Sequence, residues 1–180
     1  MESTCVALLK QQLRITWMLA EEVLAGLTQE EALWVPSPDS YTVRQLQGIW
    51  VADWAEPEPN PAPPTSIAWV QWHIIWWMSM VINHSFGDAQ LQRQDVAWPG
   101  TTESLAEINR LRLHWIERLD QLTEAELESA DYTHWPYQDD RPFALVAGWV
   151  NIELMKNVAE MASLRRSSPL YSGGRFTPNT

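Results

Sequence analysis

The fold is decided by residues 65–84, which read TSIAWVQWHIIWWMSMVINH. Four tryptophans lie around His73, and the stretch contains no Asp, Glu, Lys or Arg. At ~100° per residue, Trp69, His73, Trp76 and Trp77 share one side of a helix. A helix that is apolar on nearly all sides belongs inside a protein rather than on its surface. The stretch therefore predicts the central helix of a bundle, with the His73 imidazole directed into the interior.

The same segment does not have the pattern of a membrane span. Its apolar part, residues 67–82, is 16 residues long and includes Gln71, His73 and Ser79. A spanning helix needs ~20 apolar residues and usually has basic flanks, whereas this one lies between prolines and a Gly-Asp pair. We expect a buried helix of a soluble protein and no membrane partner.

Three more long helices are predicted from apolar residues that recur every three or four positions. They cover residues 5–26, a segment with apolar positions from Leu105 to Leu122, and about 142–166. Thr28 with Glu31, and the similar segment 122–127, have capping-box spacing and predict short helices between them. No alternation of apolar and polar residues is sustained over a strand length. The chain is therefore predicted to be all-α, a four-helix bundle with short accessory helices in its crossovers.

Length, charge and cysteine content limit the function. The 180 residues suit a single domain spanning 1–180, with residues 168–180 as a loosely held tail. Arg165 and Arg166 are expected to lie in solvent at the end of the last helix. The net charge of −11 leaves no basic stripe, which excludes nucleic acid as a natural partner. The single cysteine, Cys5, cannot form an intramolecular disulfide, and no secretory signal is visible. A cytoplasmic location is expected.

One face of the last predicted helix carries polar side chains that could form a binding or catalytic site. Trp149, Glu153, Lys156, Asn157 and Glu160 return to nearly the same azimuth, since they are spaced by three, four or seven residues. If this face packs against the Trp-rich helix, an imidazole and one or both carboxylates would form a nitrogen-and-oxygen site for a divalent ion. The alternative is a solvated face with an ion pair between Glu153 and Lys156.

The 12 tryptophans have two interpretations as well. Four of them, Trp69, Trp76, Trp77 and Trp149, lie within one or two helical turns of His73 or Glu153 and would line an aromatic pocket. The alternative is that the rings pack the core and a dimer seam, where large rigid side chains bury much area. Both can hold in one protein.

Five stretches of the chain resemble the DinB-like superfamily. They are residues 67–74 (IAWVQWHI), 83–87 (NHSFG), 96–100 (VAWPG), 149–154 (WVNIEL) and the pair 159–160 (AE). The resemblance extends from the first helix to Arg166. It implies a bacterial four-helix bundle with up-down-down-up topology, often a homodimer. The family name describes the DNA-damage induction of one member and implies no DNA binding, in agreement with the acidic charge.

The resemblance also implies a site. Many members bind a divalent metal through a histidine on the second long helix and an H-x-x-x-H pair on the fourth, and several are transferases or isomerases that use low-molecular-weight thiols. His73 matches the first position, whereas Glu153 and Asn157 stand where the pair is usual, with Glu160 one turn further. The implied set is His73, Glu153, Asn157 and Glu160, holding Mn, Fe, Zn or Ni, or no metal, with the Lys156 ammonium in place of an ion.

Two functions remain open at this point. The first is a divalent-metal- and thiol-dependent transferase with an altered metal site, whose partner is a small molecule or thiol. The second is a non-catalytic small-molecule-binding or interaction protein with a degenerate metal site. They differ in whether His73 serves chemistry or only packing.

Overall fold

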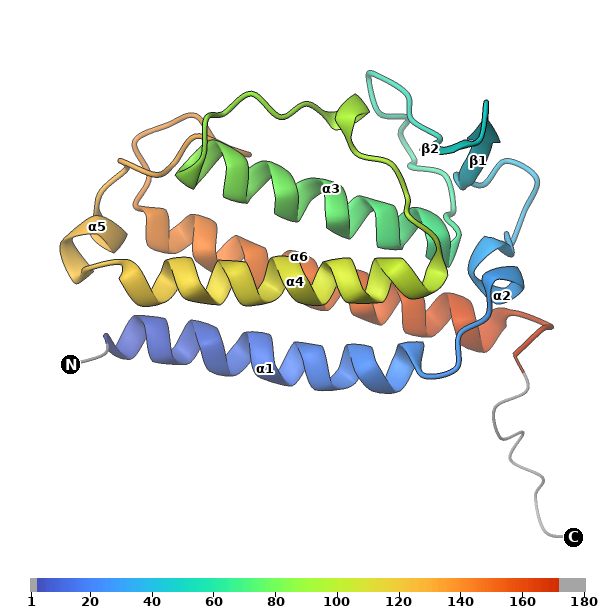
Figure 1. Cartoon of the computed structure of the whole chain (residues 1–180), viewed down its shortest axis with the longest axis horizontal. Helices are drawn as coiled ribbons and strands as arrows, with labels where there is room; N and C mark the ends of the chain where they lie inside the picture. Colours follow the sequence, from blue (N-terminus) through green and yellow to red (C-terminus); the bar gives the residue numbers. More distant parts are fainter. Residues whose placement is uncertain (1–2, 172–180) are drawn as a thin grey trace, which may run out of the picture.

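The computed structural model describes residues 3–171, and within them four long helices form a bundle (Figure 1). The long helices are α1 (Thr4–Leu24), α3 (Ile67–Phe86), α4 (Thr101–Gln121) and α6 (Phe143–Ser167). Helix α6 packs against α1 and α3, and α4 packs against the same two, so the four close into a ring. Helices α1 and α6 run in one direction and α3 and α4 in the other. The predicted all-α, up-down-down-up bundle is confirmed.

Helix α3 is the buried helix that its sequence predicts. Its N-cap is Ser66, whose hydroxyl oxygen accepts a hydrogen bond from the Trp69 amide over 3.1 Å. Trp72 and Trp77 are almost fully buried, and Trp98 and Trp115 complete the aromatic core from α4 and the loop before it. Burying rings of this size removes a large apolar area from water and is the main stabilising term of the bundle.

No helix among the described residues is long and apolar enough to cross a membrane.

Two short helices lie in the crossovers, as predicted. Helix α2 (Gln29–Leu33) begins at the capping box of Thr28 and Glu31, and α5 (Glu124–Glu128) begins at the capping box of Thr123 and Glu126. In each, the threonine side chain accepts from a helix amide while the glutamate carboxylate accepts from the threonine amide, so two otherwise unpaired donors are satisfied. A single 3-10 turn, η1 (Arg93–Asp95), lies in the loop between α3 and α4.

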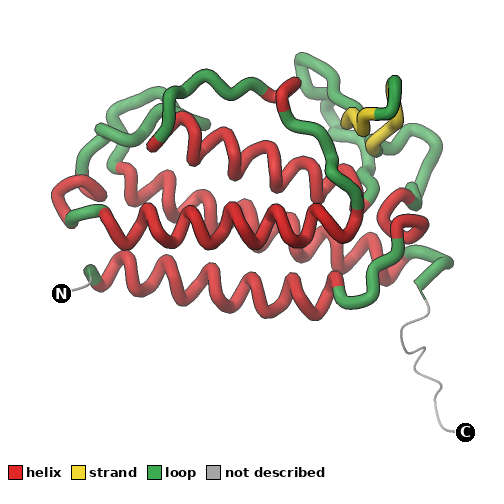
Figure 2. The backbone as a smooth tube through the Cα atoms, in the orientation of Figure 1, coloured by secondary structure: helices red, strands yellow, loops and turns green. Residues whose placement is uncertain are grey.

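A small β-hairpin is present that the sequence analysis does not predict. Strands β1 (Val43–Leu46) and β2 (Ile49–Ala52) pair antiparallel and appear in yellow in Figure 2. Only the outermost pair, Val43 and Ala52, is buried, so four-residue strands leave no alternation to detect. The turn between them places Gly48 at a φ of 85°, a conformation that glycine adopts without strain.

The hairpin leads into the proline-rich segment before α3, and this segment is tied down by Tyr41. The Tyr41 amide donates to the Pro64 carbonyl over 2.8 Å, and the Ser66 amide donates to the Tyr41 carbonyl over 2.9 Å. These two bonds hold residues 53–65 against the beginning of α3. The segment is therefore an ordered loop rather than a linker between domains.

The C-terminal end of α6 corrects one expectation. Arg165, predicted to lie in solvent, is 8% exposed. Its guanidinium donates to the carbonyls of Val23 and Ala25, over 2.5 and 2.8 Å, and lies 3.5 Å from a Glu31 carboxylate oxygen. A single side chain thus joins the ends of α1, α2 and α6. Of the expected loose tail, Ser168 is buried, and residues 172–180 lie outside the described part of the chain.

Candidate functional site

A cavity of about 190 Å³ lies where the first half of α3, the second half of α6 and the loops beside the hairpin meet. Helix α3 contributes Trp69 and His73, which are one turn apart and therefore on the same face. Helix α6 and the loops contribute the remaining polar side chains: Lys156, Asn157, Glu160, Tyr41, Glu58 and Thr65. In Figure 1 this region is at the end of the bundle that carries the hairpin.

His73 is the most perturbed titratable group of the site. Burial lowers the pKa of its imidazole to about 4, the positive charge of Lys156 acts in the same direction, and hydrogen bonding to Asn157 opposes both. The ring stacks on Trp69, with centroids 4.9 Å apart and an interplanar angle of 11°. Nδ1 is buried and has no hydrogen-bond partner in the described part of the chain. At neutral pH the side chain is therefore an uncharged imidazole with one unused nitrogen.

Asn157 connects the two helices that form the cavity. It is 1% exposed, and its Oδ1 accepts a hydrogen bond from the Trp77 indole over 3.0 Å. Trp77 is itself 1% exposed and belongs to α3. The amide oxygen that would have to bind a metal is thus already engaged in holding α6 against α3.

The two carboxylates of α6 differ in their partners. Glu160 Oε1 accepts a hydrogen bond from the Thr65 hydroxyl over 2.6 Å, which fixes the carboxylate at the wall of the cavity. Glu153 pairs with the Lys156 ammonium one turn along the same helix. Glu153 does not line the cavity. Only Glu160 therefore offers a carboxylate from α6 to a bound molecule.

The structure brings five of the predicted site residues together: Trp69, His73, Lys156, Asn157 and Glu160 line one cavity. It places Glu153, Trp76, Trp77 and Trp149 outside that lining. The three tryptophans form part of an aromatic cluster beside it, with Trp77 and Trp149 edge to face at 5.4 Å and Trp76 at 5.5 Å from the His73 ring. These rings pack next to the cavity but do not line it.

Three polar residues that line the cavity were not singled out by the sequence, and neither were Ala62 and Pro63. Tyr41, Glu58 and Thr65 come from loops, where periodicity carries no information about direction. The Tyr41 hydroxyl is buried and has no partner among the described residues, and its ring lies 6.0 Å from Trp69.

The donor set fits a divalent ion poorly. The Asn157 oxygen accepts from Trp77, and Glu153 is paired with Lys156, so neither of these side chains is free to bind an ion. Within residues 3–171, no three His, Cys, Asp or Glu side chains lie close enough to share a metal ion. Buried ligands of a divalent ion need free lone pairs and a negative or neutral environment.

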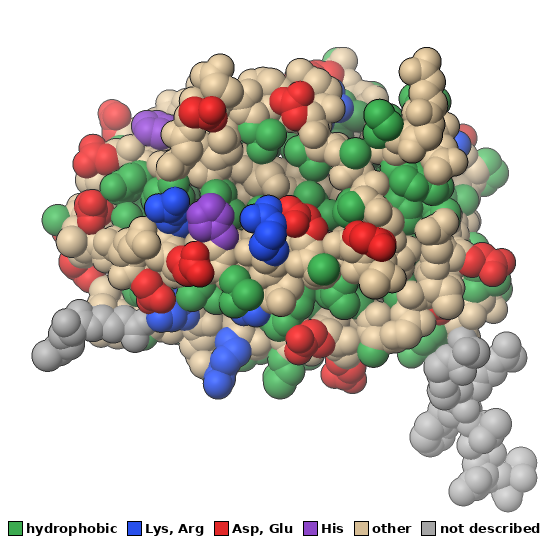
Figure 3. All heavy atoms as spheres, in the orientation of Figure 1, with side chains coloured by type: hydrophobic (Ala, Val, Ile, Leu, Met, Phe, Trp, Pro, Cys, Tyr) green, Lys and Arg blue, Asp and Glu red, His purple; other side chains and the backbone are tan. Residues whose placement is uncertain are grey.

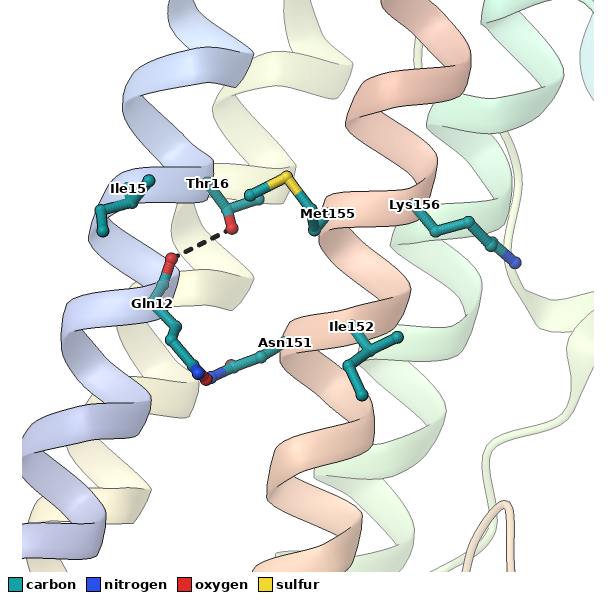
Figure 4. A pocket seen from close by; sticks show the side chains of 7 residues that line it. All are labelled: Gln12, Ile15, Thr16, Asn151, Ile152, Met155 and Lys156. Atoms are coloured by element: carbon teal, nitrogen blue, oxygen red, sulfur yellow. Dashed lines mark hydrogen bonds between the residues drawn. The ribbon is translucent and has the colours of Figure 1, made fainter.

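A larger hollow of about 500 Å³ lies on the surface between α1 and α6 (Figure 4). Ile15 projects from α1, and Ile152 and Met155 from α6, while the Thr16 hydroxyl donates to the Gln12 carbonyl. Lys156 is at its edge and points away from α1. Apart from Lys156 the lining carries no titratable side chain, so this groove has no chemistry of its own.

The molecular surface agrees with the acidic composition. On the face shown in Figure 3, Lys and Arg side chains are interspersed with Asp and Glu, and basic residues do not gather into a stripe. A phosphate backbone requires clustered positive charge.

Comparison with known proteins identifies the family. The sequence model of the DinB superfamily matches residues 12–161, which extend from α1 to α6 and include every residue that lines the cavity. The sequence has no significant match among curated proteins.

Proposed function

The chain belongs to the DinB superfamily, and we propose that it binds a small polar molecule in the cavity beside His73, directly and without a divalent ion. One observation carries this proposal: His73 and Tyr41 line the same cavity, and each carries a buried polar atom, the imidazole Nδ1 and the hydroxyl, that has no partner among the described residues. Leaving a buried polar atom unpaired costs ~1–3 kcal/mol. A ligand that bonds to both atoms would recover that free energy.

The size of the cavity restricts the ligand. Pockets for drug-sized molecules are ~300–1,000 Å³, whereas this one is about 190 Å³. Trp69 and Tyr41 offer apolar faces, and His73, Glu160 and Asn157 offer polar atoms at one end. This combination of an apolar wall with a few convergent polar groups is typical of metabolite sites.

The neutral imidazole also determines what the site can do with its ligand. With a pKa of about 4, His73 is unprotonated at pH 7 and accepts a hydrogen bond rather than a proton. The alternative, a metal- and thiol-dependent transferase, would require Asn157 and Glu153 to exchange their present partners for an ion. The existing contacts favour direct binding.

The test uses ligand-observed NMR with a library of small polar metabolites in the presence of EDTA. The variant Ala62→Trp fills the cavity from an exposed position in the proline-rich segment. Its matched control, Ala125→Trp, adds the same ring to an exposed position of α5, at the other end of the bundle. We expect ligands that bind the wild type and Ala125→Trp and lose binding in Ala62→Trp.

Two results would contradict the proposal. One is that no ligand of the wild type is sensitive to Ala62→Trp. The other is that binding at the cavity occurs only after EDTA is replaced by Zn²⁺ or Mn²⁺, which would favour the metal-dependent alternative.

A further inference from the structure

We infer that the cavity recognises the ammonium group of a small organic amine. This inference rests on the proposed function, since it names the class of ligand for the same site. It is carried by the placement of the charges, the unused acceptors and the aromatic rings around the cavity.

The charges that line the cavity are predominantly negative. The lining includes two carboxylates, that of Glu160 and that of the exposed Glu58, and one ammonium, that of Lys156. Lys156 is paired with Glu153, whose carboxylate therefore offsets its charge. Among the described residues, neither Glu58 nor Glu160 has a basic partner within ion-pair distance. A cation would find uncompensated carboxylates here, whereas an anion would be repelled by them.

Two hydrogen-bond acceptors among the lining residues are unused. Glu160 uses Oε1 for the Thr65 hydroxyl, and its other oxygen accepts no bond from the described residues. His73 Nδ1 has no partner there either. An ammonium carries up to three N–H donors and can serve more than one acceptor, whereas a single hydroxyl donates only once.

Two aromatic rings complete the environment that ammonium groups prefer. Trp69 and Tyr41 line the cavity with centroids 6.0 Å apart, and the Trp69 ring is fixed because its indole nitrogen donates to the Asp53 carbonyl over 2.8 Å. The negative face of an indole or phenol attracts a cation within ~6 Å of its centroid. The same rings would pack against the carbon atoms of the amine.

The experiment compares three molecules of one shape: 3-methylbutylamine, 3-methylbutanol and 3-methylbutanoate, titrated calorimetrically at pH 7. They differ in a cationic, neutral or anionic head group. We expect the amine to bind at least about tenfold more tightly than the alcohol, since hydrogen bonds to charged groups are stronger than neutral ones, and the carboxylate not to bind.

Two matched variants assign the effect to the cavity. Glu160→Gln keeps an oxygen for the Thr65 hydroxyl, removes the charge and replaces the second oxygen by an NH2 group, so amine affinity should fall about tenfold while the neutral alcohol should lose less. Glu117→Gln removes one charge from an exposed position of α4 and should leave both unchanged. Lys156→Met, which removes the opposing cation, should tighten amine binding.

Tighter binding of the carboxylate than of the amine, equal binding of amine and alcohol, or no effect of Glu160→Gln would each overturn the inference. No binding by any of the three molecules would overturn it as well. The proposed function would then be decided separately, by whether the metabolite library yields ligands that Ala62→Trp displaces.

Discussion

At the scale of single residues, the buried imidazole of His73 makes the stability of the folded protein depend on pH. Its pKa is about 4 in the folded protein and close to 6.5 in an unfolded chain. Between these values the unfolded chain binds a proton that the folded protein does not. The stability associated with the neutral imidazole is therefore complete above pH 6.5 and is lost as the pH falls from 6.5 to 4, by about 3 kcal/mol in total.

The measurement is urea unfolding of the wild type and of His73→Gln from pH 7 to pH 4. The wild type should lose about 3 kcal/mol more than the variant over this interval, and NMR titration of the His73 ring should give a pKa near 4. A ring that titrates near 6.5, with parallel stability curves, would show that the imidazole is not desolvated as described.

His73 and Arg165 show what a sequence can reveal about a residue. The inward direction of His73 follows from the apolar helix around it, which periodicity reports directly. Arg165 was misread because two of its partners are the backbone carbonyls of Val23 and Ala25, more than a hundred positions away. Every residue has a backbone carbonyl, so the residue types at positions 23 and 25 do not predict this contact.

At the scale of elements, Arg165 joins three helix ends. It donates to the last carbonyls of α1 and lies against Glu31, whose carboxylate also accepts from the Thr28 amide of the capping box. Removing one member of a buried ion pair leaves the other charge uncompensated. We expect Arg165→Met to lower the free energy of unfolding by about 3 kcal/mol.

The neighbouring residue provides the control for this variant. Arg166 is exposed on the same helix, and Arg166→Met should change stability by less than about 0.5 kcal/mol. Both values are obtained from chemical denaturation at pH 7. Equal effects of the two substitutions would mean that Arg165 acts only through the general charge of the helix end.

The helices and strands differ in whether residues close together in the sequence are enough to predict them. The long helices follow from apolar periodicity, and α2 and α5 from the spacing of Thr28 with Glu31 and Thr123 with Glu126, because capping is an interaction over three residues. The hairpin pairs two four-residue strands that each bury only one residue, and the exposed Arg44 side chain pairs with Asp53 just after β2. Strands this short carry too little apolar alternation to be predicted, and the positions of Tyr41 and Thr65 in the cavity were not predicted either.

At the scale of the whole molecule, the groove between α1 and α6 relates to the predicted homodimer. Ile152 and Ile15 are 70% and 41% exposed and line this groove. A two-fold contact buries the same patch on both copies, and a patch with little charge is suited to it. The homodimer stays a prediction, with a second copy of the chain as the expected occupant.

Analytical ultracentrifugation tests this prediction with a matched pair of variants. Ile152→Glu places a charge in the groove and should convert a dimer into a monomer. Leu46→Glu places a charge at another exposed apolar residue, which is on the hairpin, is 59% exposed and lies outside the groove. This variant should leave the dimer intact. A monomeric wild type, or a dimer unaffected by Ile152→Glu, would contradict the assignment of this face.

The central claim is that the His73 cavity serves an organic ligand rather than a divalent ion. Elemental analysis by mass spectrometry tests it most directly, on wild type and His73→Ala purified without chelator or nickel resin and then dialysed against Mn²⁺, Fe²⁺, Zn²⁺ or Ni²⁺. We expect far less than one ion per chain in both proteins. About one ion per wild-type chain that disappears in His73→Ala would contradict the account.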